Sequence, residues 1–200
     1  MARVVTIPRL DEPHKARRDV AGRRVTLDSL ETWSGRYLNV VIETPKDQPN
    51  KLKYDATAGT MRLSKVLPVG MVFPFDFGFV PSTQGADGDP LDVLVLMDAP
   101  APPGCLVEAR LIGVLRCTQR EARRKSVTND RFLAVAKEAS TYRHIRDIRD
   151  LSGPTLDQIE AFFVQYNAVS GRVFRVIRRQ GRTAAERSVE EARRSPTGTD

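Results

Sequence analysis

The chain has 200 residues, enough for one ordinary domain with a sizeable core, and a formal net charge of +7 at pH 7. Hydrophobic residues make up 40% and charged residues 28%, which excludes collagen-like and wholly disordered chains. The longest apolar run without Gly or Pro covers residues 93–97, far short of the roughly 18 residues of a membrane span. We therefore expect one globular fold and no membrane partner.

The two cysteines and the N-terminal residues bear on the compartment. Cys105 and Cys117 do not have a metal-ligand spacing, and one optional pair is no disulfide framework, so we expect both to be reduced. The N-terminal basic residues are not followed by the apolar stretch of a secretory signal. These features predict a cytoplasmic protein.

The positive charge is distributed unevenly. Residues 172–194 contain eight arginines against three glutamates, and residues 116–125 contain five basic residues against one glutamate. A charge run of this kind is usually a solvated face, but it also suits a nucleic acid, an anionic membrane surface or a small polyanion.

The predicted elements begin after an arm. Residues 1–35 show no sustained period and are expected to end in a helical turn near 27–31. A first strand is predicted at 37–43, and a loop follows at 45–50. Further short strands are predicted at 61–63, 77–80, 91–97, 105–116 and 132–136. Such spacing is typical of a small all-β barrel.

The period changes after residue 140. Apolar residues at three- and four-residue steps predict one amphipathic helix over 154–169, behind Gly153 and ahead of Gly171. A last strand is expected at 172–178 and a terminal helix at 183–194. The predicted organisation is an N-terminal arm (1–35), a barrel domain with a packed helix (36–180) and a C-terminal basic helix or tail (181–200).

The densest chemical signal is an acidic turn formed by Asp87, Asp89 and Asp92, at the mouth of the strand predicted at 91–97. Carboxylates this close raise one another's pKa, and a hard divalent cation relieves the repulsion. An ordinary Asp-Gly turn before a strand is the alternative interpretation. An EF-hand is excluded because the sixth loop position is Asp92 rather than Gly, and the twelfth is Asp98 rather than Glu.

With its surroundings, the D-G-D-P-L-D-V-L segment at 87–94 resembles the family I soluble inorganic pyrophosphatases, and the likeness extends over about 37–178. The resemblance implies a mainly β fold with flanking helices (α+β), built on an OB-like five-stranded β-barrel. It also implies hydrolysis of pyrophosphate to two phosphates, dependence on Mg²⁺ with other divalent ions possible, and homo-oligomers that are often hexameric in bacteria.

The resemblance further implies roles for individual residues. Asp87 and Asp92 fall where the family binds metal ions, and Asp89 falls where its candidate base meets the attacking water. Four more positions match the family's site: Lys51, Lys65 and Tyr166 as substrate-binding residues, and Glu43 as an acid behind the metal ligands. Each has a plainer interpretation, as an exposed lysine, a helix-stripe residue or a strand-end charge.

Several positions depart from the family pattern. Lys53 replaces a second acid, Phe73 and Phe77 replace tyrosines, and Asn167 replaces a lysine. These changes bear on the rate and the substrate.

The loop after Leu115 departs furthest from the family pattern. Gln119 and Asn129 stand nearest to two metal-binding aspartates. We expect fewer metal ions than in the family, with one of three arginines over the product phosphate: Arg123, Arg124 or Arg131. Alternatively, the adjacent acids Glu121 and Asp130 act as the ligands.

Two other functions remain open. One is a catalytically impaired phosphate- or nucleotide-binding relative of the pyrophosphatases. The other is a nucleic-acid-binding barrel, which is disfavoured because aromatic residues make up only 6% of the chain and the strand phenylalanines cluster beside the acidic turn. We expect pyrophosphate and phosphate as ligands and no specific nucleic acid.

Overall fold

The computed structural model describes residues 25–122 and 124–193. Most of the arm predicted for 1–35 therefore lies outside the described residues. The described part begins with a 3₁₀ turn, η1 (Leu27–Ser29), where a helical turn is predicted, and a short strand, β1 (Trp33–Ser34).

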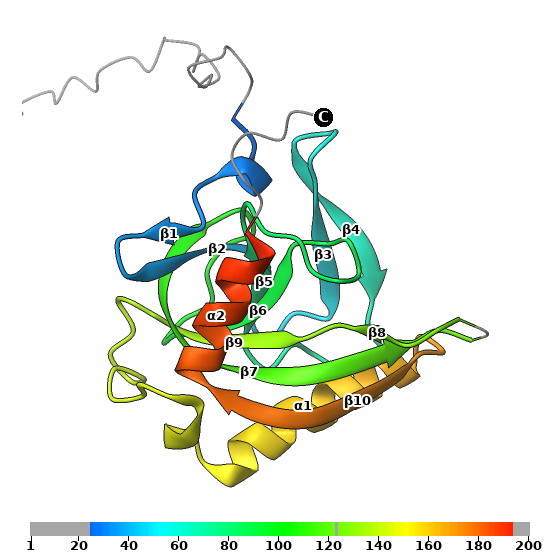
Figure 1. The fold of residues 1–200 in the computed structure, drawn as a ribbon. Coiled ribbons are helices and arrows are strands. Elements are labelled where there is room, and N and C mark those ends of the chain that lie inside the picture. Colours follow the sequence, from blue (N-terminus) through cyan, green and yellow to red (C-terminus); the bar gives the residue numbers. More distant parts are fainter. Residues whose placement is uncertain (1–24, 123, 194–200) are drawn as a thin grey trace, which may run out of the picture.

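Five strands close into a barrel (Figure 1). They are β2 (Tyr37–Thr44), β5 (Asp76–Val80), β6 (Leu91–Leu96), β9 (Arg131–Ala136) and β7 (Leu106–Arg120), paired in that order. The start of β7 pairs back with β2 and closes the ring, and β6 and β9 run parallel. The predicted mainly β, OB-like five-stranded fold is confirmed.

Strand β7 is long and pairs with different neighbours along its length, and its pairing changes near Gly113. Its register with β9 shifts between Leu111 and Gly113, and its second half pairs with β10 (Val173–Gly181). A Cβ at Gly113 would lie 2.6 Å from Cβ of Ile148 and 2.7 Å from the carbonyl oxygen of Gln180. Glycine therefore lets β10 and the short helix η2 (Ile148–Asp150) pack closely on the strand.

A hairpin formed by β3 (Asn50–Asp55) and β4 (Thr60–Val66) makes a separate two-stranded sheet. The sequence pattern predicts only 61–63 of this hairpin and does not predict β3. Strand β7 also continues to Arg120, past the predicted end at 116, and β8 (Val127–Thr128) pairs back with it. The basic segment after Leu115 is therefore largely a β-ribbon, where a loop is predicted.

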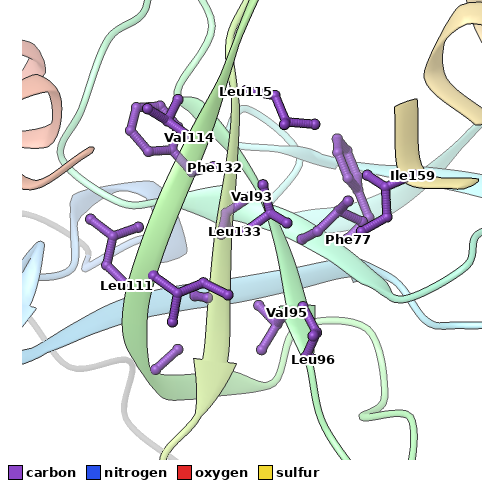
Figure 2. Close-up of a cluster of buried hydrophobic side chains, with 14 of the residues drawn as sticks. Phe77, Val93, Val95, Leu96, Leu111, Val114, Leu115, Phe132, Leu133 and Ile159 are labelled. Atoms are coloured by element: carbon purple, nitrogen blue, oxygen red, sulfur yellow. The ribbon is translucent and has the colours of Figure 1, made fainter. Parts of the chain in front are cut away.

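The core fills the barrel and the space beneath helix α1 (Gly153–Ala168) (Figure 2). The helix begins at Ser152, whose side chain accepts a hydrogen bond from the backbone N–H of Thr155. Ile159 and Phe163 are buried against the barrel, as the predicted period requires. Helix α1 runs along β10 in Figure 1.

The second helix, α2 (Arg182–Ala192), packs against β7. Its residues Ala185 and Val189 are fully buried, so the helix contributes to the common core. Within the described residues, no helix is long and apolar enough to cross a membrane.

Candidate functional site

A cleft of about 520 Å³ lies between the β3–β4 hairpin, the acidic turn and the end of α1. All seven site residues predicted from the sequence line this cleft: Glu43, Lys51, Lys65, Asp87, Asp89, Asp92 and Tyr166. They come from β2, β3, β4, the turn before β6, β6 itself and α1, so the barrel and its additions bring together residues that are far apart in the chain.

The acidic turn is shaped by its own backbone. Gly88 has a φ of 90°, a conformation that favours glycine, and the backbone N–H of Gly85 donates to the carbonyl oxygen of Asp89 at 2.7 Å. The Asp87 carboxylate accepts from the backbone N–H of Asp89 at 3.3 Å. Partial burial and the nearby negative charge of Asp92 raise the pKa of Asp87. The turn therefore concentrates carboxylate charge at one wall of the cleft.

Two carboxylates of the turn are ion-paired. Lys53 Nζ lies 2.7 Å from Asp89 Oδ2, and Arg131 Nη1 lies 2.8 Å from Asp92 Oδ2. In the described part of the chain, Asp87 has no ion-pair partner within 4.0 Å. Partial burial lowers the pKa of Lys53, but the hydrogen bond and charge of Asp89 outweigh burial, so the pKa is raised.

Arg131 is the most firmly held cation of the cleft. Its side chain is 5% exposed, and Nη1 also donates to the backbone carbonyls of Asn129 and Asp130. Its guanidinium lies 5.1 and 5.3 Å from the ring centroids of Phe163 and Phe174. Arg131 is one of the three arginines expected over the product phosphate. It lies at the start of β9, which runs beside β6, and this position brings it to Asp92.

Glu43 is 5% exposed, and its Oε1 accepts from the backbone N–H of Tyr54 at 2.7 Å. Burial and the charge of Asp92 raise the pKa of Glu43 to about 7, against the lowering effect of that hydrogen bond and of Lys51. Glu43 therefore links β2 to β3 and holds a proton more firmly than an exposed glutamate does.

The two predicted lysines and Tyr166 line the same cleft. Lys65 Nζ lies 4.2 Å from the Tyr166 ring centroid and donates to Ser170 Oγ at 2.9 Å. Lys51 Nζ lies 5.0 Å from the Phe77 ring centroid and 5.4 Å from that of Tyr166. Two ammonium groups thus line the same cleft as the carboxylates, an arrangement suited to binding an anion.

Gln119 and Asn129, which stand nearest to two metal-binding aspartates of the family pattern, are hydrogen-bonded to each other. The Asn129 side chain donates to Gln119 Oε1 at 3.1 Å, and its own oxygen accepts from Arg131. Asp130 is bound by Arg116 Nη1 at 2.6 Å and by the backbone N–H of Cys117 at 2.9 Å, and it does not line the cleft. Asp130 is therefore held in a structural network.

Of the remaining loop residues, Glu121 lies in the cleft. Its carboxylate pairs with Arg172 at 2.8 Å and with Arg124 at 3.5 Å. Arg124 is an exposed residue outside the cleft wall, and Arg123 lies outside the described residues.

The donor set of the acidic turn fits a divalent cation by its chemistry. Carboxylate oxygens are the hard donors that Mg²⁺ and similar ions prefer, and the pKa of Asp87 is raised by partial burial and by the negative charge of Asp92. Between residues 25 and 193, leaving out 123, no three acidic, histidine or cysteine side chains already converge on one point. The carboxylates of Asp89 and Asp92 point to side-chain cations of the protein itself.

The barrel and a cleft lined by both carboxylates and basic side chains are typical of a class of proteins that bind phosphate-containing anions. The family model of inorganic pyrophosphatase matches residues 40–196. The chain is 36% identical to the inorganic pyrophosphatase of Synechocystis sp. over 70% of this chain and 80% of the relative. It is 35% identical to that of Thermus thermophilus over 78% and 86%. The chain therefore belongs to the inorganic pyrophosphatase family.

Solved structures agree with this assignment. The crystal structure of inorganic pyrophosphatase from Thermus thermophilus superposes with a TM-score of 0.77 and 34% identity, covering 84% of this chain and 97% of that one. The inorganic pyrophosphatase from Helicobacter pylori superposes with a TM-score of 0.74 and 34% identity, covering 82% and 95%.

Proposed function

We propose that the protein hydrolyses inorganic pyrophosphate to two phosphates in this cleft, with a divalent cation, Mg²⁺ in the first instance. The observation that carries the proposal is that the three aspartates of the acidic turn line the same cleft as Lys51, Lys65 and Tyr166. Family membership supports the same reaction.

In this proposal, Asp87 and Asp92 hold the cation, which when bound lowers the pKa of a water and neutralises phosphoryl charge. Asp89 accepts the proton of the attacking water. Lys51 and Lys65 bind the phosphate oxygens, and the Tyr166 ring keeps both ammonium groups in place. Arg131 adds a fixed positive charge beside Asp92. Glu43 stands behind the carboxylates and ties β3 to the barrel.

We also propose that the protein works as a homo-oligomer in the cytoplasm, on the strength of its likeness to the family. Pyrophosphate and phosphate are the expected ligands. The alternative, a phosphate- or nucleotide-binding relative without turnover, is less well supported, because the three aspartates of the turn line the same cleft as the lysines.

The test is phosphate release from pyrophosphate, with and without Mg²⁺. Replacing Asp92 with asparagine should lower turnover by orders of magnitude and leave the melting temperature of the metal-free protein near that of the parent. The matched control is Asp157→Asn, on the outer surface of α1 in an ion pair with Arg179. Turnover of Asp92→Asn at the parent rate, or Mg²⁺-independent phosphate release by the parent, would contradict the proposal.

A further inference from the structure

We propose that Lys53 is an internal counter-ion of the acidic turn, which competes with divalent cations for the negative charge of the turn and so weakens metal binding at Asp87 and Asp92. The inference rests on the proposed function, in which Asp87 and Asp92 hold the cation and Asp89 lies beside them in the same turn. It concerns Lys53, which has no role in the reaction proposed above.

The contact that carries the inference joins two parts of the chain that share no strand pairing. Lys53 belongs to β3, which pairs with β4 alone, whereas Asp89 lies in the turn before β6. Lys53 Nζ lies 2.7 Å from Asp89 Oδ2, and both residues line the cleft. The pair can therefore open by a side-chain rotation that breaks no strand pairing.

The two counter-ions of the turn differ in how they are held. Arg131 is 5% exposed, donates to several oxygens and packs against two aromatic rings, so its pairing with Asp92 is fixed by the core. The side chains of Lys53 and Asp89 are 47% and 57% exposed. A lysine ammonium is well hydrated and mobile on its stem, so Lys53 can leave its carboxylate for water. Lys53 is accordingly the exchangeable counter-ion.

The competition follows from charge. An ammonium group on Asp89 compensates one of the three negative charges of the turn, and it repels a doubly charged ion placed nearby. Metal binding at Asp87 and Asp92 must therefore overcome this repulsion or move the Lys53 ammonium group away. Removal of that charge should leave the carboxylates of Asp87, Asp89 and Asp92 less compensated and should tighten metal binding.

The experiment measures metal affinity directly. Mn²⁺ is titrated into the metal-free full chain, with bound ion followed by calorimetry and free ion by electron paramagnetic resonance. Lys53→Met should lower Kd about tenfold or more, equivalent to about 1.4 kcal/mol. Lys53→Arg keeps the charge and should bind Mn²⁺ as the parent does.

The matched control is Lys137→Met. Lys137 forms a comparable pair with Glu108 at 2.6 Å, with side chains 41% and 34% exposed, but it does not line the cleft. This variant removes the same net charge and should leave Kd near the parent value. An independent readout is melting temperature, which Mn²⁺ should raise further in Lys53→Met than in the parent or in Lys137→Met.

The outcomes separate the inference from the proposed function. An unchanged or weaker Kd for Lys53→Met, with clear Mn²⁺ binding by the parent, overturns the competition and leaves the metal site standing. Equal tightening in Lys137→Met shows a general charge effect and also overturns it. Failure of the parent and all variants to bind Mn²⁺ overturns both the metal site and the inference.

Discussion

At the residue scale, the cleft contains nearly equal numbers of opposed charges. Five basic and six acidic side chains line it, the basic ones being Lys51, Lys53, Lys65, Arg131 and Arg172. Asp89 and Asp92 are paired with cations, whereas Glu43 is buried with a raised pKa. Glu43 is thus the cleft acid whose ionisation is most strongly opposed by its surroundings, and this makes stability depend on pH.

We predict that Glu43→Gln stabilises the metal-free protein at pH 8 and has little effect near pH 4.5. The pKa of Glu43 is raised in the folded state, so folding favours its protonated form. The resulting cost is absent below the ordinary pKa, grows as pH rises from 4.5 towards 7, and is complete above that. The pKa rise corresponds to roughly 3 kcal/mol at most. Glutamine removes the cost and can still accept from the Tyr54 backbone.

Urea unfolding at both pH values, in the presence of a chelator, measures this effect. Glu138→Gln, at an exposed position, serves as the control and should show no such difference. Equal effects of Glu43→Gln at the two pH values would contradict the assigned cause.

The residues of the acidic turn can be predicted from their spacing because they are adjacent in the sequence. Their partners cannot, because Lys53 lies 36 positions away from Asp89 and reaches it only through the β3–β4 hairpin. Arg131 likewise reaches Asp92 only because β9 runs parallel to β6. Basic residues near the turn are visible in the sequence, but which carboxylate each one meets is decided by tertiary structure.

At the scale of elements, β2 and β5 approach each other at a glycine. A Cβ at Gly78 would lie 2.0 Å from the carbonyl oxygen of Val41 and 3.0 Å from Cα of Ile42. Both neighbours are backbone atoms of β2, so neither can rotate away. Close strand contact here positions Glu43, one residue beyond Ile42, in the lining of the cleft.

We predict that Gly78→Ala destabilises the protein by about 3 kcal/mol or more, because the methyl group forces the barrel strands apart. Gly153→Ala is the control: nothing lies within 4 Å of its Cβ position, at the start of α1. That variant should be neutral or stabilising by up to about 1 kcal/mol. Denaturant unfolding of the two variants checks the difference, and comparable stabilities would refute it.

The apolar strands and α1 follow from sequence period because their buried positions recur regularly. Strand β3 is not predicted from the sequence because none of its six residues is fully buried. Its polar residues Asn50, Lys51 and Lys53 are types that are also common in loops. Its structure depends on pairing with β4 and on the bond between Tyr54 and Glu43. The end of β7 is missed for a similar reason: β8 and β10 extend it past Arg116 by pairing.

At the scale of the whole molecule, acidic and basic side chains nearly balance inside the cleft. The net charge of +7 therefore comes from residues outside the cleft. Exposed arginines such as Arg175 and Arg178 on β10 contribute to it. A molecule of this charge attracts a polyanion over a distance, and salt screens that attraction.

We predict that kcat/KM for pyrophosphate falls several-fold as NaCl rises from about 50 to 500 mM, while kcat changes less. The double variant Arg175→Gln, Arg178→Gln should have a lower kcat/KM at low salt and a shallower salt dependence. Steady-state kinetics at fixed free Mg²⁺ checks this. A kcat/KM that is independent of salt in the parent would show that long-range charge plays no part.

The closure of the barrel by β2 and β7 has a consequence for synthesis on the ribosome. Leu38 pairs with Ala109, 71 positions later, and the ring is complete only when β9 is available. Until then β2, β5 and β6 can form at most an open sheet with two bare apolar edges. At about 5 to 20 residues per second, β2 waits roughly 5 to 20 seconds for β9. The nascent chain is therefore most prone to aggregate while its middle third is being made.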